Sequence, residues 1–326
     1  MRLSPGPSGM AGAASARKVR VLYIVGSMRS GSTLLGRWLE SSGSYCSVGE
    51  LHAIWEHAFI ENMLCGCGTH IRSCDFWNAV VEEAFGGWDG IDARRIQEIW
   101  FSTLGTRSFW YRGLHSAVSR GFRTRVAECR QVQERLYKAI ASVSGCGTII
   151  DSSKSPAPAF VMRENPALDF YPLHLVRDSR AVAFSLRRKK RRPEISESVA
   201  YLQQSRPMKA SVSWNNVNLA ASMLRSPGLE DARYLRIRYE DLIPSPESIL
   251  SQIAEYLGEP VGKCRLENHS IVNLHVNHST GGNPMRFQAG PLPIQLDDEW
   301  RRAMPWPQRA VVTALTWPLL KNYGYL

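Results

Sequence analysis

The chain has 326 residues, of which 44% are hydrophobic, and its 40 Lys and Arg exceed its 29 Asp and Glu, for a formal net charge of +11. This length suits one large α/β domain or two smaller ones, and the apolar content is enough for a packed core. A basic balance suits an anionic ligand, a nucleic acid or an anionic lipid, so charge by itself excludes none of them. No uninterrupted apolar run is long enough to cross a bilayer, so we expect no transmembrane segment.

The first 18 residues are rich in Ser, Gly, Ala and Pro and lack the apolar core of a signal peptide. We expect residues 1–18 to form a disordered tail and the protein to be cytoplasmic. In that compartment the seven cysteines are expected to be thiols or metal ligands rather than disulfides.

Strand and helix patterns alternate along the chain. Short apolar runs predict strands at 19–25, 45–48, 147–150, 169–176 and 233–238. Apolar periodicity and end signals predict helices at 32–42, 129–143, 179–190, 209–224 and, between Ser245 and Gly258, at 246–257. The segment 297–326 is predicted to be helical in part, with breaks at Pro305, Pro307 and Pro318.

This alternation predicts a three-layer, P-loop-like α/β fold with a central parallel sheet and helices on both faces. Neither an internal repeat nor a linker is visible, so we expect a single domain at 19–326. A helical insertion at 51–146 is expected to lie on the acceptor side. Its aromatic residues either line an acceptor pocket or fill a core; they include Trp55, Phe76, Trp77, Trp100 and Trp110.

The stretch 19–35 reads as a buried strand, a loop of small residues and the start of a helix, which is the arrangement of a phosphate-binding loop. Gly26 and Gly31 have the spacing of a P-loop, but Ser32 stands where that motif has its lysine, and the cation is Arg29 within the loop. A phosphate site is therefore predicted, with magnesium and a nucleoside triphosphate less favoured. The alternative is an ordinary strand-to-helix turn.

A second strand-to-helix junction carries Arg177 at the end of its strand and Ser185 about two turns into the following helix. Ligands bind at this edge of open α/β sheets, and an arginine fork with a hydroxyl suits a second, separate phosphate. A structural ion pair of Arg177 is the alternative.

Together the two motifs resemble those of the sulfotransferases that use 3'-phosphoadenosine 5'-phosphosulfate. The resemblance covers roughly residues 19–50 and 147–260. It implies that Arg177 and Ser185 bind the 3'-phosphate and that the donor needs no metal. The loop that it assigns to the 5'-phosphosulfate consists of Arg29, Ser30, Gly31, Ser32, Thr33 and Leu34.

Glu50 is the predicted general base, as the resemblance implies for a glutamate at this distance after the loop. A base needs a raised pKa, and we expect partial burial to supply it. Lys154 is predicted to be a second cation beside the transferring group. The alternatives are a helix-capping glutamate and a surface lysine. Asp151 ends an apolar strand like a Walker B aspartate, which leaves a small-molecule kinase as a competing hypothesis.

Later segments supply further candidates for the nucleotide site. The resemblance implies a nucleotide contact for Tyr239 and a late loop that closes over the 3'-phosphate. From that loop the candidates are Ser279, Gly282 and Arg286.

The roles of two clusters, one of basic residues and one of cysteines, are left with more than one interpretation. The basic block 187–192 suits a solvated helix end, a nucleic-acid patch or a surface that attracts an acidic acceptor. A nucleic-acid-binding protein is therefore a third hypothesis. The solvated helix end is the favoured one, so we expect no nucleic-acid partner. A cysteine cluster with nearby histidines suits either a structural zinc or a thiol-lined loop; its members are Cys65, Cys67 and Cys74, with His52, His57 and His70. The predicted acceptor is a small molecule, a carbohydrate or a lipid.

Overall fold

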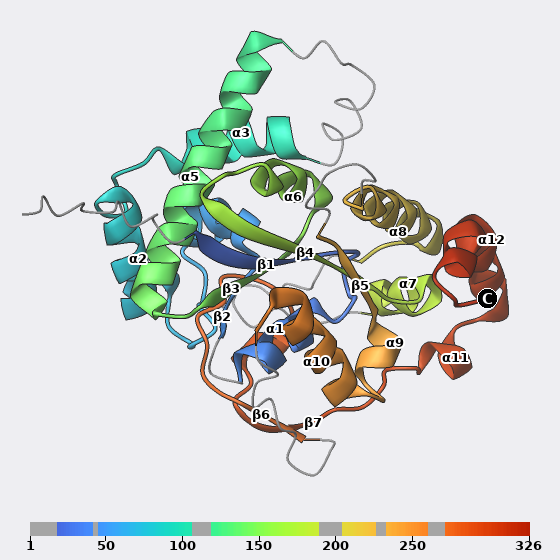
Figure 1. Ribbon diagram of the computed structural model, residues 1–326. Helices are drawn as coiled ribbons and strands as arrows, with labels where there is room; N and C mark the ends of the chain where they lie inside the picture. Colours follow the sequence, from blue (N-terminus) through green and yellow to red (C-terminus); the bar gives the residue numbers. More distant parts are fainter. Residues whose placement is uncertain (1–17, 42–44, 106–118, 189–203, 226–232, 260–270) are drawn as a thin grey trace, which may run out of the picture.

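The computed structural model describes residues 18–41, 45–105, 119–188, 204–225, 233–259 and 271–326. Its centre is a sheet of five parallel strands in the order β2-β3-β1-β4-β5 (Figure 1). The strands are β1 (Val19–Val25), β2 (Tyr45–Gly49), β3 (Thr148–Lys154), β4 (Leu168–Val176) and β5 (Leu235–Arg238).

Helices make up most of the remaining described chain. The longer ones are α1 (Ser32–Glu40), α2 (Asp75–Phe85), α3 (Ala93–Leu104), α5 (Arg120–Ser144), α6 (Pro156–Arg163), α7 (Ser179–Arg187), α8 (Pro207–Ser222), α10 (Pro246–Leu257) and α12 (Trp306–Asn322). Shorter turns are η1 (Leu51–Ala53), the π-helix η2 (Trp55–Ile60), η3 (Ile71–Ser73), α9 (Tyr239–Leu242), η4 (Pro284–Phe287) and α11 (Trp300–Ala303). A small antiparallel pair consists of β6 (Ile271–Leu274) and β7 (Gly290–Pro293).

The two faces of the sheet bury alternate side chains of β1. Val21 and Tyr23 pack into a core with α2, α3, α5 and α6, whereas Leu22 and Ile24 pack against α1 and α10. Figure 1 shows α5 and α6 on one side of the sheet and α1 and α10 on the other. Burying each such side chain stabilises the fold by about 1.5–3 kcal/mol. The predicted parallel sheet with helices on both faces is thus confirmed.

A third core lies beyond the β5 edge, where α7 and α8 pack against α11 and α12. The prediction that Pro318 breaks the last helix is wrong, because α12 continues through it to Asn322. The buried residues Val312, Thr316 and Leu320 form the packed face of α12, and Pro318 is exposed. The hydrogen bond that proline removes is therefore lost on the solvent side, where water replaces it.

Several predicted boundaries differ from the structure. The third strand does not end at Asp151 but runs on to Lys154, with an irregularity in its pairing to β1. Helix α1 ends at Glu40, and α8 begins at Pro207. Gly258 closes α10 in the left-handed conformation as predicted, but the side chain of Ser245 makes no cap hydrogen bond.

Some expectations fall outside the described residues, including the tail at 1–17 and the end of the predicted helix at 189–190. Within the segment 51–146, helices α2, α3 and α5 cover one face of the sheet. Among the described residues, no helix is both long and apolar enough to cross a membrane.

Candidate active site

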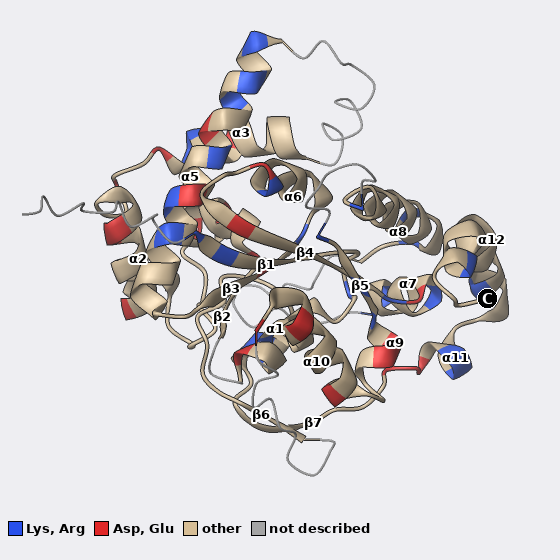
Figure 2. Ribbon diagram, in the orientation of Figure 1, with Lys and Arg blue, Asp and Glu red and all other residues tan. Residues whose placement is uncertain are grey.

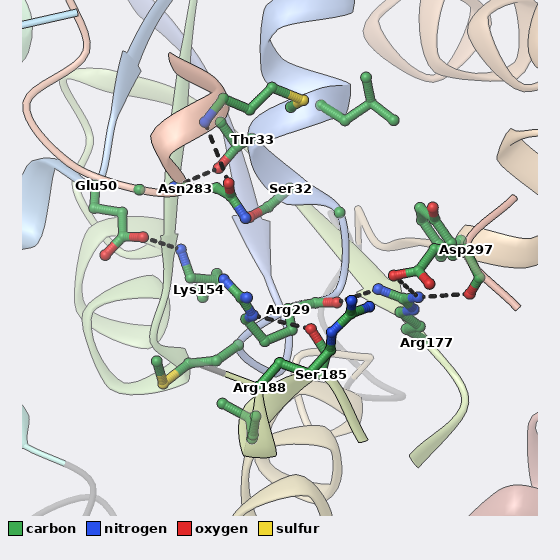
Figure 3. Close-up of a pocket in the computed structure, with 17 residues that line it drawn as sticks. Arg29, Ser32, Thr33, Glu50, Lys154, Arg177, Ser185, Arg188, Asn283 and Asp297 are labelled. Atoms are coloured by element: carbon green, nitrogen blue, oxygen red, sulfur yellow. Dashed lines mark hydrogen bonds and ion pairs between the residues drawn. The ribbon is translucent and has the colours of Figure 1, made fainter. Parts of the chain in front are cut away.

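A pocket lies at the carboxyl edge of the sheet, and all five strands deliver residues to it (Figure 3). This is the edge where open α/β sheets bind ligands. At this edge the loop 26–31 follows β1, Glu50 follows β2, Lys154 ends β3, Arg177 follows β4 and Tyr239 follows β5. The predicted site residues that line the pocket are Arg29, Gly31, Ser32, Thr33, Leu34, Glu50, Lys154, Arg177, Ser185, Tyr239 and Gly282.

The loop after β1 leaves backbone and hydroxyl groups unpartnered at the start of α1. Gly31 precedes the helix with a φ of 95°, and no side chain caps the first turn. The hydroxyls of Ser27 and Ser30 are buried and lack a hydrogen-bond partner among the described residues. No acidic residue lies in the first turn, so the positive end of the helix dipole is uncompensated there. The arrangement suits an anion.

The two predicted phosphate motifs meet in this pocket. Arg29 donates from Nε to Oγ of Ser185 at 3.1 Å, and Arg177 donates from Nη1 to the carbonyl oxygen of Arg29 at 3.1 Å. The guanidinium of Arg177 lies over the Tyr239 ring at 4.4 Å and pairs with Asp297 at 3.0 Å. Its Nε has no partner among the described residues. One buried donor of Arg177 is therefore left unsatisfied.

The charge of the pocket is positive. Its lining includes the cations Arg29, Lys154, Arg177 and Arg188 and two carboxylates. Burial lowers the pKa of Arg29, and the nearby guanidinium of Arg177 lowers it further. Crowding of cations costs free energy that a bound anion offsets. The pocket thus suits a ligand with more than one negative group.

Glu50 and Lys154 form an ion pair at the side of this pocket, with Nζ 2.5 Å from Oε1 (Figure 3). Nζ also donates to the carbonyl oxygen of Ser152 at 3.0 Å. Burial raises the pKa of Glu50, but the charges of Lys154 and His52 and the hydrogen bond from Lys154 outweigh it and bring the pKa to about 2. The expectation of a raised pKa is therefore wrong for the unliganded protein, because the charge of Lys154 stabilises the ionised carboxylate of Glu50.

Two of the pocket cations have strained backbones. Arg29 and Lys154 both have positive φ, at 67° and 65°, a region that costs a residue with a side chain about 1–3 kcal/mol. Such conformations persist only where the surrounding structure fixes them, and they occur often at functional sites. Here they turn both side chains into the pocket.

Asp151 does not lie at a magnesium-binding position. Its carboxylate is almost fully buried and accepts hydrogen bonds from the Tyr137 hydroxyl at 2.7 Å and from the backbone N–H of Ser153 at 2.9 Å. Burial raises its pKa to about 6, although these hydrogen bonds oppose the rise. Asp151 therefore braces β3 against α5 outside the pocket lining.

The late loop, residues 278–287, contributes Gly282 to the pocket wall. Gly282 lines the pocket with a φ of 117°, and a Cβ there would lie 3.0 Å from Oγ1 of Thr33. Asn283 donates its backbone N–H to the same Thr33 hydroxyl oxygen at 3.2 Å. The loop thus closes against the first turn of α1.

Three predicted nucleotide contacts do not line the pocket. Ser30 is fully buried beneath the loop. Ser279 is bonded to the side chain of Asn277. Arg286 is buried and donates to the carbonyl oxygen of Leu64 at 3.1 Å. Ser279 and Arg286 thus hold the late loop in place in this structure, outside the pocket lining.

Several residues that line the pocket were not predicted from the sequence. Asp297, which precedes α11, and the segment of Asn283 and Met285 reach the pocket only through the tertiary fold. Arg188 also lines it and pairs with Glu299, so the described start of the basic block belongs partly to the pocket. Residues 189–192 lie outside the described residues. Figure 2 shows other Lys and Arg residues spread over α5, α7 and α11.

Comparison with known proteins agrees with this geometry. The model of the sulfotransferase family matches residues 22–263, so the chain belongs to that family. Carbohydrate sulfotransferase 3 of Homo sapiens is 26% identical over 172 residues, which are 50% of this chain and 35% of that protein. The Mus musculus protein is 25% identical over 169 residues, again 50% of this chain and 35% of the relative. This chain thus spans about a third of the length of these relatives.

Solved structures of sulfotransferase domains are also similar. The domain of the Synechococcus PCC 7002 olefin synthase is 19% identical and covers 93% of this chain and 96% of that one, with a TM-score of 0.47. The domain from the curacin biosynthetic pathway is 18% identical and covers 93% and 98% of the two chains, also with a TM-score of 0.47.

Proposed function

We propose that this protein transfers the sulfuryl group of 3'-phosphoadenosine 5'-phosphosulfate to a hydroxyl or amine of an acceptor. The observation that carries the proposal is the hydrogen bond between Arg29 and Ser185, which joins two anion-binding motifs of a sulfotransferase-family chain in one positive pocket. A nucleotide with anionic groups on both its 5' and 3' sides would engage the two motifs together.

The residues present fit such a donor. The 26–31 loop and the first turn of α1 would hold the 5'-phosphosulfate through backbone N–H groups and the side chain of Arg29. Arg177 and Ser185 would hold the 3'-phosphate, and Tyr239 would extend the site beside them.

The donor supplies an activated sulfuryl group for in-line transfer, and the chain's task is positioning and charge stabilisation. Arg29 and Lys154 would stabilise the negative charge that develops during transfer. Glu50 would take the proton of the acceptor hydroxyl on a carboxylate oxygen. For that, Lys154 must turn from Glu50 toward the anionic donor, which removes the main cause of the low Glu50 pKa. We infer that donor binding activates the base.

The acceptor class is proposed from two sources. The relatives named above are carbohydrate sulfotransferases, which favours a carbohydrate or another small hydroxyl compound, with a lipid as an alternative. Four aromatic residues of the insertion lie outside the lining of the positive pocket, because Trp55, Trp77 and Trp100 are buried in the core and Phe76 packs against His278. Trp110 lies outside the described residues. The cytoplasmic location stays a prediction.

A kinase is the weaker candidate. The loop has Ser32 where a P-loop has its lysine, and the carboxylate of Asp151 is enclosed by Tyr137 and Ser153. Both features of a magnesium–triphosphate site are therefore missing from the part of the chain described.

The test compares thermal stability with adenosine 3',5'-bisphosphate, with ATP and magnesium, and with buffer. We expect stabilisation by the bisphosphate only, its loss in Arg177→Met and its retention in Arg123→Met, an exposed arginine on α5. Glu50→Gln should bind the bisphosphate but lose most transfer of labelled sulfate. Stabilisation by ATP and magnesium only, or equal behaviour of the two arginine variants, would contradict the proposal.

A further inference from the structure

A cluster of three thiols and one imidazole lies outside the proposed reaction. Sγ of Cys65, Cys67 and Cys74 and a ring nitrogen of His278 all lie within 4.8 Å of one another. The histidine was not found from the sequence, where His70 was the nearest candidate. His70 instead bonds to the carbonyl oxygen of Asn62 at 2.7 Å.

The distances in the cluster are those of a tetrahedral metal site. Zinc–sulfur bonds of about 2.3 Å and zinc–nitrogen bonds of about 2.0 Å put two sulfurs about 3.8 Å apart and a sulfur and a nitrogen about 3.6 Å apart. Cys67 and Cys74 have their sulfurs 3.8 Å apart. Nδ1 of His278 lies 3.2 Å from Sγ of Cys74 and 3.9 Å from Sγ of Cys65. A sulfur separation of 3.8 Å is far longer than a disulfide bond of about 2.05 Å.

The backbone around the first two cysteines is a tight turn that aims both thiols the same way. Cys65 accepts from the N–H of Gly68 at 2.9 Å and donates its own N–H to Thr69 at 2.7 Å. Gly68 has a φ of 90°, and a Cβ on Gly66 would lie 2.2 Å from Oδ1 of Asn277. Gly66 therefore has no room for a side chain, and the left-handed backbone of Gly68 favours glycine although space is open around it.

The imidazole is held from outside the cluster. Its ring stacks on Phe76, with centroids 4.8 Å apart and an angle of 16° between planes. The carbonyl oxygen of His278 accepts from Nε1 of Trp77 at 2.7 Å. Contacts beyond the ligands that fix ring orientation are typical of metal-binding histidines.

We propose that Cys65, Cys67, Cys74 and His278 bind one structural Zn²⁺. Three thiolates and one imidazole are a soft ligand set that favours zinc over magnesium or calcium. Four protein ligands complete a tetrahedron, so no position is open for substrate or water, which separates this site from the chemistry of the sulfuryl transfer.

The metal would fasten the late loop to the segment 65–74, from which it is about 200 residues distant. The loop continues from His278 to Gly282 and Asn283 in the pocket wall. On the way, Ser279 accepts from the N–H of Gly66 at 3.0 Å, and Thr280 donates its N–H to Val48 at 3.0 Å. The zinc thus holds one wall of the anion pocket without touching it.

The first test is the metal content of the full chain, purified with a reductant and without chelator. We expect about one zinc per chain, and at least tenfold less in Cys74→Ser and in His278→Ala. The matched control is Cys146→Ser, a half-buried cysteine outside the cluster, which should keep its zinc.

A second test does not depend on the variants folding. Wild-type protein stripped of metal and loaded with Co²⁺ should show the intense thiolate-to-cobalt absorption and the visible bands of tetrahedral cobalt. A wild-type protein that contains no zinc and takes none up against a chromophoric chelator would overturn the proposal. So would zinc that survives both ligand substitutions, cobalt spectra without thiolate bands, or cluster thiols that are already paired as a disulfide.

Discussion

The ion pair of Glu50 and Lys154 should make the free energy of unfolding depend on pH, and this can be tested without measuring turnover. Folding lowers the pKa of Glu50 from 4.5 to about 2, chiefly because the charge and hydrogen bond of Lys154 outweigh burial. The unfolded chain therefore binds a proton more readily than the folded one at acid pH. The ionised carboxylate stabilises the fold above pH 4.5, by about 3 kcal/mol, and this stabilisation is lost as pH falls toward 2.

The perturbation is Glu50→Gln, which removes the charge and leaves the ammonium of Lys154 half-buried without its carboxylate. Urea unfolding at pH 7 should show the variant to be less stable by about 3 kcal/mol. At pH 3 the difference should shrink to about half of that value, because Glu50 is already protonated in the unfolded chain at that pH while it is still largely ionised in the folded protein. Glu98→Gln, on the exposed side of α3, is the control and should change stability little at either pH.

The reasoning is refuted by a difference between wild type and Glu50→Gln that stays constant from pH 7 to pH 3. That result would mean that the loss comes from packing and not from charge. Equal stability of the two proteins at pH 7 would also refute it, because the pair would then contribute nothing to folding.

Two further predictions concern Gly31 in the pocket and the buried His174. Gly31→Ala should weaken binding of adenosine 3',5'-bisphosphate at least tenfold by calorimetry, because its Cβ would lie 2.6 Å from the Tyr239 ring and its φ is 95°. His174→Gln should flatten the acid dependence of stability in urea unfolding. Burial lowers the pKa of His174 to about 4, between the Tyr234 hydroxyl at 2.6 Å and Asn218 at 2.8 Å, so wild type should lose about 2.5 kcal/mol from this group between pH 7 and pH 4.5.

Each of these has a matched control. Gly121→Ala changes a glycine of α5 whose Cβ would meet no closer atom than 3.7 Å, and it should leave bisphosphate binding intact. His275→Gln changes an exposed histidine and should preserve the wild-type acid dependence. Unchanged bisphosphate affinity in Gly31→Ala would speak against the loop as the anion seat. A wild-type acid profile in His174→Gln would show that His174 is not the group responsible.

Much of the fold could be predicted because local sequence determines it. Apolar runs gave β1 and β4 to within a residue, and the left-handed glycine gave the end of α10. The pocket loop was also visible, since a strand, two spaced glycines and a helix start are a local pattern. Such features depend on neighbours along the chain and on backbone preferences.

What could not be predicted depends on contacts between distant segments. His278 lies 204 residues from Cys74, and no spacing rule connects them. Asp297 reaches Arg177 only because α11 and α12 pack beyond the β5 edge. The low pKa of Glu50 likewise required knowing that Lys154 turns back toward it with a positive φ. The β6–β7 pair was missed because both strands are four residues long and β7 contains two prolines.

The late loop closes the pocket with residues that are synthesised after the whole parallel sheet. Every strand of the parallel sheet has been synthesised once residue 238 has left the ribosome. The pocket wall at Gly282, Asn283 and Asp297 follows only afterwards, as does His278 of the cysteine cluster. Because chains fold from the N-terminal side during synthesis, the sheet and its first anion-binding loop form before anything closes over them. A nascent chain that stops before residue 278 therefore leaves this positively charged edge of the sheet open, and the pocket can close only after residues 278–297 have been made.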